Sequence, residues 1–580
     1  MRKHARATGI RWGVTVVIAF ALVPLALLGS ASPAEAGLLG TILGGGGSAG
    51  PTQPYIVTDL NSTGSLTDIV DSVGGLVTGA LSFINGAVTD LTSAQVSSLA
   101  AQPGIVVTPD LTLSVAGGFE KARDARAPAA VFPEDSGASQ LWAQGDNGSG
   151  VNVAVVDTGI DNLPDFAGRL LPGVDLSGEG NPNLDSYGHG TFVAGLIAGD
   201  GASSNGTYSG EAPGAGLVPV KVAGASGQTD MATVISGIGW VISHRQSEHI
   251  GVLNLSLGVQ PVESTVIDPL DQAVEAAWNA GITVVVSAGN AGPFNGTILS
   301  PGDDPLVITA GALDDQGQTV PSAASMATFS SVGPTNPDGW FKPDLVAEGA
   351  HVVSLRAPGS TVDTANPSAR IGAGNFVGSG TSFSSAIVSG AAALLLADHP
   401  GLSPNAVKGA LLDSALPGPV GNPFVDGHGQ LDVAAAAGDS AVLNQATDGG
   451  GGVLGGILGG LLGSRGTPMG TTVSLGTTWK TSPWNGSQWN GSSWSGSQWN
   501  GSQWNGSSWS GSSWSDAYWS GSQWNGSQWN GSSWSGSQWN GSSWSGSQWN
   551  GSQWNGSQWN GSSWSGSQWN GSQWNGSQWN

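Results

Sequence analysis

The feature that most constrains the fold is an alternation of short β-branched runs with helical stretches between about residues 136 and 440. Runs such as VNVAVVD, GVLNLSL and ITVVVSAG are apolar almost throughout, instead of alternating with polar residues. Such strands, separated by helices, are typical of βαβ units whose parallel sheet is buried on both faces. The sequence therefore predicts one α/β domain over 131–440, with a mostly parallel central sheet flanked by helices.

Composition excludes several classes of function. The chain of 580 residues has a formal net charge of −24 and contains no cysteine. An acidic chain is a poor partner for nucleic acid, which needs a basic surface. Without cysteines, disulfide scaffolds, thiolate zinc sites and thiol catalysis are all excluded.

The N-terminus has the pattern of an export signal. A positively charged start is followed by the apolar stretch 14–28, and Ala34-Glu35-Ala36 then fits a small-x-small cleavage site. The alternative is an uncleaved membrane anchor, but this stretch is short for a span and Pro24 interrupts it. We predict a signal peptide over 1–36 and a secreted, extracellular protein, and the lack of cysteines favours bacterial secretion.

Between the signal and the α/β domain, residues 37–130 form a separate region. Its core, about 54–115, contains the strand-like runs PYIVTDL and GIVVTPDLTLSV, and between them the helix-like run TSAQVSSLAAQ. An Ala/Arg/Pro-rich connector follows over 116–135, as expected for an exposed, cleavable segment. After the α/β domain, residues 441–475 are Gly-rich and are predicted to be a linker.

The tail, 476–580, is a strict repeat in which Trp recurs every five residues from Trp479 to Trp579. Three interpretations remain open. The tail is a partly disordered spacer, a pentapeptide solenoid, or a surface-retention module whose indoles stack on sugar rings of a cell envelope or polysaccharide. Lys480 and Asp516 are almost its only charges, so retention by the third route would resist salt.

Four polar residues stand where parallel α/β folds gather their functional groups. Asp157 ends one apolar strand, Asn290 follows another, His189 precedes a helix and Ser382 opens one. Each alone has an ordinary structural explanation, such as a helix cap or a turn residue. Together they fill the roles of acyl transfer: a nucleophile, a base, an acid that orients the base, and an oxyanion donor.

The chain order Asp, His, Ser is one of the three known for this geometry. No HExxH, GxSxG or phosphate-loop signature competes with it. Acyl chemistry alone does not separate a peptidase from an esterase. A surface or adhesive protein that uses the domain only as a scaffold is a further alternative, kept open by the Trp-rich tail.

These motifs resemble the subtilisin family of serine peptidases over roughly 136–440. The matching stretches are Asp157-Thr158-Gly159-Ile160-Asp161, Gly188-His189-Gly190-Thr191, Ser256-Leu257-Gly258, Ser287-Ala288-Gly289-Asn290 and Gly380-Thr381-Ser382. The resemblance implies a serine endopeptidase acting on proteins and peptides, with Asp157, His189 and Ser382 as the triad and Asn290 as the oxyanion donor. It also implies that Ser256, Leu257 and Gly258 line the substrate cleft.

By the same resemblance, 54–115 is a propeptide that assists folding and inhibits the enzyme until it is removed. The chemistry requires no cofactor. Asp165 matches a calcium ligand of the family, although the loop at 200–210 differs from the family's calcium loop. His189 and Asn290 argue against the sedolisin relatives, which lack the His of the GHGT motif. The chain departs from the family pattern at Phe192, Val259, Glu348 and 384–386, none of which is a candidate catalytic residue.

Overall fold

The computed structural model describes residues 50–61, 65–115, 118–119, 131–319 and 321–438, together with the backbone of five strands in the tail. The predicted signal peptide (1–36) and linker (441–475) lie outside these residues, as does most of the predicted connector.

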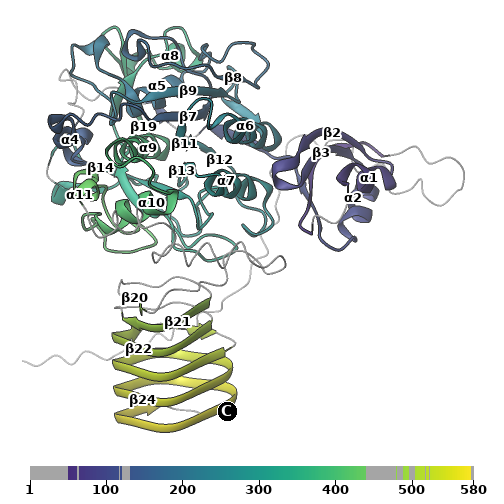
Figure 1. Ribbon diagram of the computed structural model, residues 1–580, viewed down its shortest axis with the longest axis vertical. Helices are drawn as coiled ribbons and strands as arrows, with labels where there is room; N and C mark the ends of the chain where they lie inside the picture. The colour runs from purple at the N-terminus through teal and green to yellow at the C-terminus, as the bar shows by residue number, and fades with distance from the viewer. Residues whose placement is uncertain are drawn as a thin grey trace, which may run out of the picture. The chain divides into compact units, whose positions relative to one another are not determined.

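The centre of the fold is an eight-stranded sheet (Figure 1). Its strands lie in the order β15-β14-β13-β11-β7-β9-β8, and β16 also pairs with β14. All the pairs are parallel except β14 with β15. The strands are β7 (Asn152–Asp157), β8 (Val174–Asp175), β9 (Gly216–Lys221), β11 (Ile250–Leu255), β13 (Thr283–Ser287), β14 (Ile308–Asp314), β15 (Ser325–Met326) and β16 (Leu345–Glu348).

Helices cover both faces of this sheet, since every residue of β13, and every residue of β7 after Asn152, is buried. Helix α9 packs against β11, β13 and β14, whereas α6 and α7 pack against each other. The main helices are α5 (His189–Ala198), α6 (Met231–His244), α7 (Pro269–Asn279), α9 (Thr381–Asp398) and α10 (Pro404–Asp413). The α/β prediction is confirmed.

Among the described residues, α9 alone is long and apolar enough to cross a membrane, and most of it is buried in this core.

The N-terminal unit is a four-stranded antiparallel sheet in the order β2-β3-β1-β4, with two helices. Its elements are β1 (Gln53–Asp59), α1 (Leu66–Ser72), β2 (Leu76–Leu81), β3 (Gly86–Leu91), α2 (Ser93–Ala100) and β4 (Ile105–Pro109). Helix α2 begins at a capping box, in which Thr92 and Gln95 satisfy each other's backbone N–H groups.

The run GIVVTPDLTLSV forms two strands that belong to different sheets. After β4 the chain leaves the N-terminal sheet, and β5 (Thr112–Val115) lies between β10 (Gln228–Asp230) and β12 (Leu257–Gly258). Both neighbours are antiparallel to β5. A strand from the N-terminal region thus pairs with two short strands of the α/β domain.

A smaller antiparallel sheet contains β17 (Val352–Leu355), β18 (Arg370–Ile371) and β19 (Asn375–Ser379). The two-residue strand β6 (Gly118–Phe119) also pairs with β19. The remaining short helices and turns are η2 (Ser82–Ile84), α3 (Phe132–Asp135), α4 (Ala138–Gln144), η3 (Pro164–Phe166), η4 (Ala202–Ser204), η5 (Pro321–Ala323), α8 (Thr361–Ala365), η6 (Pro367–Ala369) and α11 (Val433–Gly438).

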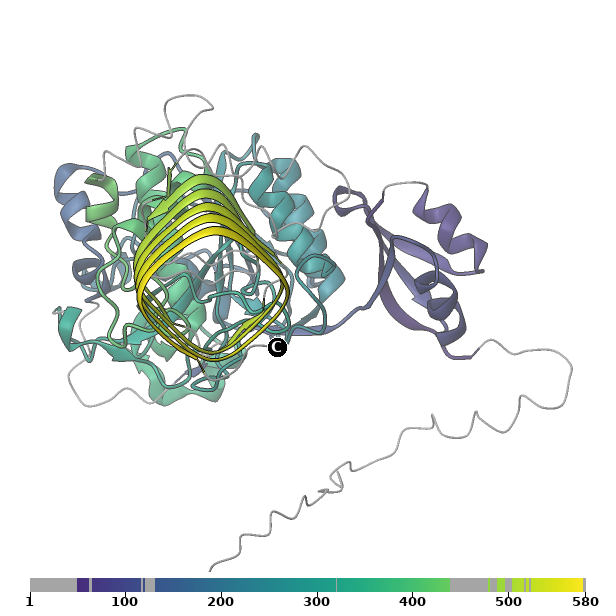
Figure 2. The same cartoon turned by 90° about the horizontal axis from the view of Figure 1, so that it is seen from below.

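The tail backbone winds into a coil of parallel strands, seen end-on as a four-sided ring in Figure 2. Gln488 pairs with Gln503 fifteen residues later, and Gln503 pairs with Gln523 twenty residues later. Each turn therefore takes three or four pentapeptides. Of the three interpretations, the backbone follows the solenoid. The strands are β20 (Thr478–Trp479), β21 (Gln488–Ser495), β22 (Gln503–Ser515), β23 (Tyr518–Ser520) and β24 (Gln523–Gly576).

Candidate active site

Three candidate residues meet because they follow adjacent parallel strands. Strands β7, β11 and β13 are neighbours in the sheet. Asp157 is the last residue of β7, Ser256 comes directly after β11, and Asn290 comes three residues after β13. Carboxyl ends of parallel strands open on the same edge of a sheet, so this edge collects the three side chains.

Asp157 holds the imidazole of His189 from the side of Nδ1. The distances from Nδ1 to the two carboxylate oxygens are 2.8 and 2.9 Å, and both side chains are fully buried. A carboxylate only accepts hydrogen bonds, so it fixes the neutral ring in the tautomer with the proton on Nδ1. Nε2 is then the basic nitrogen of His189. The two residues therefore have the relationship of an acid that orients a base.

Asp185, which we did not single out from the sequence, ties the two segments of this pair together. Its Oδ1 accepts hydrogen bonds from the Gly188 amide at 2.6 Å and from the Thr158 hydroxyl at 2.7 Å. Its Oδ2 accepts from the Thr191 amide at 2.7 Å. One buried carboxylate thus joins the residue after Asp157 to the residues that flank His189. Burial raises the pKa of Asp185, and hydrogen bonds from Thr191, Gly188 and Thr158 oppose that rise.

The glycine after His189 is required by a close approach of two backbones. A Cβ on Gly190 would lie 2.2 Å from the carbonyl oxygen of Gly159, in the turn that follows Asp157. Only a residue without a side chain allows this contact. The glycines of the two motifs therefore keep His189 within reach of Asp157.

Ser382 is the second residue of α9, and its side chain is buried. The Ser382 hydroxyl donates to the carbonyl oxygen of Ser256 at 3.1 Å. The next residue, Phe383, has its ring centroid 5.7 Å from that of His189. The start of α9 therefore adjoins both the His189 helix and the end of β11. At a helix N-terminus, the first backbone N–H groups and the helix dipole favour a negative charge.

The amide of Asn290 has a defined orientation. Its Oδ1 accepts from the Thr381 backbone amide at 2.9 Å and from the Thr381 hydroxyl at 3.0 Å. Since both partners donate, the oxygen must face them, and this assigns the amide unambiguously. The NH₂ group is left as the end that can donate to a ligand beside Ser382.

Leu257 and Gly258 form one side of a channel that holds an extended segment, whereas Ser256 is buried and contacts Ser382. Leu257 pairs with Val115 and Gly258 pairs with Ser114, both of β5, while β10 pairs with the other edge of the same strand. The family resemblance implied that this motif lines the substrate cleft. In the structure, the peptide in that position is a segment of the same chain.

Asp165 does not have the surroundings of a calcium ligand. It is buried, and its two carboxylate oxygens accept from the backbone amide of Ser203 at 3.1 and 3.2 Å. The Ser203 hydroxyl also donates to it. No group of three or more acidic or histidine side chains suited to a metal ion occurs among the described residues. Calcium binding therefore stays a prediction from the resemblance, without support at Asp165.

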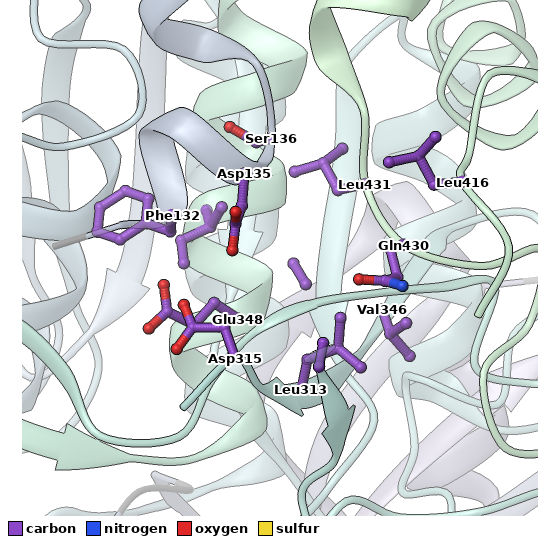
Figure 3. A pocket seen from close by; sticks show the side chains of 13 residues that line it. Phe132, Asp135, Ser136, Leu313, Asp315, Val346, Glu348, Leu416, Gln430 and Leu431 are labelled. Atoms are coloured by element: carbon purple, nitrogen blue, oxygen red, sulfur yellow. The ribbon is translucent and has the colours of Figure 1, made fainter. Parts of the chain in front are cut away.

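A small pocket apart from these residues gathers three carboxyl groups, from Asp135, Asp315 and Glu348 (Figure 3). Burial raises the pKa of Asp135 to about 7 and that of Glu348 well above its usual range, and the charge of Asp315 adds to both. Glu348 is one of the departures from the family pattern. The pocket contains none of the four candidate catalytic residues.

Fold and site together define a class: a serine hydrolase built on a parallel α/β sheet. Comparison with known proteins narrows it. Residues 148–447 match the family model described as the subtilase family. The chain is 42% identical to the serine protease AprX of Bacillus subtilis over 293 residues, spanning 49% of this chain and 66% of that protein. It is 32% identical to subtilisin NAT of Bacillus subtilis subsp. natto over 386 residues, spanning 65% of this chain and 87% of that protein.

Among solved structures, fervidolysin from Fervidobacterium pennivorans, a keratinolytic enzyme related to subtilisin, aligns with a TM-score of 0.53 at 24% identity. The alignment covers 68% of this chain and 62% of fervidolysin, and supports the fold. The chain belongs to the subtilase family and is a serine endopeptidase.

Proposed function

We propose that this subtilase is a secreted endopeptidase, made as a pre-pro-enzyme, that cleaves peptide bonds through an acyl-enzyme on Ser382. The observation that carries the assignment is the geometry of Asp157, His189 and Asn290 around the N-terminus of α9. The channel between β10 and β12 favours a peptide over a simple ester, because it pairs with an extended backbone.

The chemistry follows from these positions. Nε2 of His189 takes the proton of the Ser382 hydroxyl as its oxygen attacks the scissile carbonyl carbon, and Asp157 stabilises the resulting imidazolium. The amide of Asn290 and the backbone N–H of Ser382 stabilise the oxyanion. Collapse breaks the C–N bond, and His189 gives its proton to the leaving amine. Water, deprotonated by His189, then hydrolyses the acyl-enzyme and restores Ser382.

The test is Ser382→Ala in the full-length chain. We expect a loss of several orders of magnitude in kcat, with residual catalysis from binding and the oxyanion site, as subtilisin itself behaves. A serine-directed phosphonate should label the wild-type protein at Ser382 and leave the variant unlabelled. Peptidase activity near the wild-type level in Ser382→Ala would refute the assignment.

We also propose that 37–130 is a propeptide that occupies the cleft until it is removed. Support comes from β5 paired with β12, and from β6 paired with β19 three residues before Ser382. Since β5 ends at Val115 and β6 begins at Gly118, we place a first autocatalytic cut between these residues. N-terminal sequencing should find that cut in the wild type, whereas exported Ser382→Ala should retain the segment. A mature wild-type chain that still begins near Gly37 would contradict the proposal.

For the tail we propose retention on a cell envelope or polysaccharide, motivated by its regular Trp repeat and its near absence of charge. Deleting 466–580 should leave hydrolysis of small soluble peptides unchanged and abolish binding to envelope or insoluble polysaccharide. Binding by the full-length protein should persist at 1 M salt, at about a 3 Å screening length. Equal binding by the truncated and full-length proteins would refute retention through the tail.

A further inference from the structure

Next to the candidate catalytic residues lies a cluster of four phenylalanines, one of which comes from the N-terminal region. The ring of Phe119 lies 5.4 Å from that of Phe192, 5.4 Å from that of Phe376 and 5.9 Å from that of Phe383, measured between centroids. Its contact with Phe192 is edge-to-face. The other three rings are at most 2% exposed, whereas Phe119 is only partly buried. Three buried rings of the α/β domain therefore surround a fourth ring delivered by β6.

This cluster adjoins the catalytic groups directly. Phe192 lies one turn after His189 on α5, and Phe383 is the residue after Ser382 on α9. Phe192 and Phe383 contact each other with centroids 4.4 Å apart. Phe192 is also a departure from the family pattern, in which His usually stands at this position. The ring of Phe192 therefore adds an aromatic surface at a position where this chain departs from that pattern.

The polarity of the chain sets the side of the scissile bond on which the cluster lies. β5 occupies the channel N-terminal to the proposed cut, and β6 follows it on the C-terminal side. Gly118 pairs with Ser379, and Phe119 pairs with Gly378. A Cβ on Gly378 would lie 2.8 Å from the Phe383 ring and 3.2 Å from both Phe119 and the Gly118 carbonyl oxygen. The glycine therefore leaves room for a peptide to pass along β19 with its aromatic side chain against Phe383.

We propose that Phe192, Phe376 and Phe383 form a specificity pocket for an aromatic side chain on the leaving-group side of the scissile bond. Phe119 occupies this pocket in the unprocessed chain. The inference rests on the proposed peptidase function and adds a substrate preference to it. An aromatic ring suits the pocket because it buries a large apolar area and meets the three rings at stacking and edge distances. An acidic side chain there would lose its hydration without gaining a partner.

The first test uses quenched fluorescent peptides that copy 112–118 (TLSVAGG) followed by Phe, Tyr, Leu, Ala or Asp. The enzyme is the full-length protein after its own processing, with the cleaved bond mapped by mass spectrometry. A parallel preparation carries Phe119→Ala, because a processed chain that keeps Phe119 would hold its own competitor. We expect kcat/KM to be about tenfold or more higher for Phe than for Ala, and lowest for Asp. A Phe-to-Ala ratio within twofold of one, in both preparations, overturns the pocket.

The second test changes the wall of the pocket. Phe376→Ala should bring the Phe-to-Ala ratio of kcat/KM towards one, and Phe376→Leu should keep part of the preference. The matched control is Phe424→Ala, which removes a ring stacked on Phe341 at 4.2 Å, outside the cluster, and should keep the ratio. An unchanged ratio in Phe376→Ala contradicts the proposal. If the alanine variant does not fold, the leucine variant and the wild-type peptide series still decide.

Different results would refute the peptidase function and the aromatic pocket. If the wild-type protein hydrolyses no peptide and takes no phosphonate label, the proposed function fails and the pocket with it. If it hydrolyses all five peptides equally, the peptidase assignment stands and only the pocket is refuted. Autoprocessing gives an independent readout: Phe119→Ala should slow the first cut, and Phe119→Tyr should restore its rate. Equal rates in the two variants would contradict the role of the ring.

Discussion

Asp185 offers the sharpest test of how the site is held together, because it is separate from the chemistry yet joins both segments that carry the Asp157–His189 pair. Its carboxylate accepts from Thr158, Gly188 and Thr191 at 2.6–2.7 Å and is 2% exposed. In Asp185→Asn, an NH₂ group must replace one of the two oxygens. At least one donor then faces another donor, at an expected cost of about 1–3 kcal/mol in the free energy of unfolding.

Asp185→Ala should cost more, because it leaves three buried donors without their acceptor. Three unsatisfied groups at about 1–3 kcal/mol each set an upper range. Relief from burying the carboxylate, whose pKa is raised by desolvation, offsets part of this. We expect a net loss of about 3–5 kcal/mol. Activity should fall as well, by about 10²-fold in kcat/KM, since His189 would no longer be held at the correct position.

Unfolding in urea should be followed in a Ser382→Ala background, so that samples do not digest themselves, and kcat/KM in the active background. The matched control is Asp200→Asn. Asp200 pairs with Arg169 at 3.5 Å and its side chain is 41% exposed. Screening by water makes such a pair worth about 0–1 kcal/mol. If Asp185→Asn and Asp200→Asn lose equal stability, or Asp185→Ala keeps kcat/KM within threefold of wild type, the reasoning is refuted.

Three further outcomes are expected. Asn290→Leu should raise the activation barrier by about 2.7–4 kcal/mol, and so lower kcat, with KM little changed; this range was measured on a subtilisin and so comes from this same family. A rise in KM alone would contradict an oxyanion role. In the wild type, stability should fall as pH rises above about 5, because burial raises the pKa of Glu348 in the folded state and its ionisation therefore destabilises the fold. Glu348→Gln should reduce this fall, and an unchanged dependence of the thermal unfolding temperature on pH would contradict the prediction. Glu263 accepts a hydrogen bond from the Thr108 hydroxyl at 2.6 Å, and burial raises the pKa of Glu263 to about 7. Ionisation of this buried group as pH rises through about 7 should destabilise the contact and accelerate release of the proposed propeptide. Glu263→Gln should remove that acceleration in size-exclusion time courses.

The sequence predicted the α/β domain well because its strands carry their own evidence. In β7 and β13 nearly every residue is buried, so the apolar runs mark strands covered on both faces. The same holds for the motifs at their ends, which bring Asp157 and Asn290 to one edge. The start of α2 was also predictable, because the residues of a capping box are close in sequence.

What the sequence did not predict depends on partners that are distant along the chain. Asp185 resembles any loop acid until the fold places it against Thr158, 27 residues away. An acid shortly before the GHGT motif was the only available signal. The run GIVVTPDLTLSV looked like one extended segment, yet β4 and β5 belong to different sheets. An alternating pattern predicts a strand, but it does not predict which neighbouring strand this strand pairs with.

The way β5 joins the α/β domain explains how a propeptide can support this cleft and later leave it. Asp110 accepts the Ala232 amide at 2.9 Å, and the carbonyl oxygen of Leu111 accepts the Met231 amide at 2.9 Å, both at the start of α6. These are first-turn amides that water can satisfy once the segment departs. The edges of β10 and β12 then become open for another extended peptide. Both strands are only two or three residues long, which limits unwanted pairing with other chains. On the proposed processing, the same edges would accept first the 37–130 segment and then the substrate, and the amides of Met231 and Ala232 would pass from this segment to water.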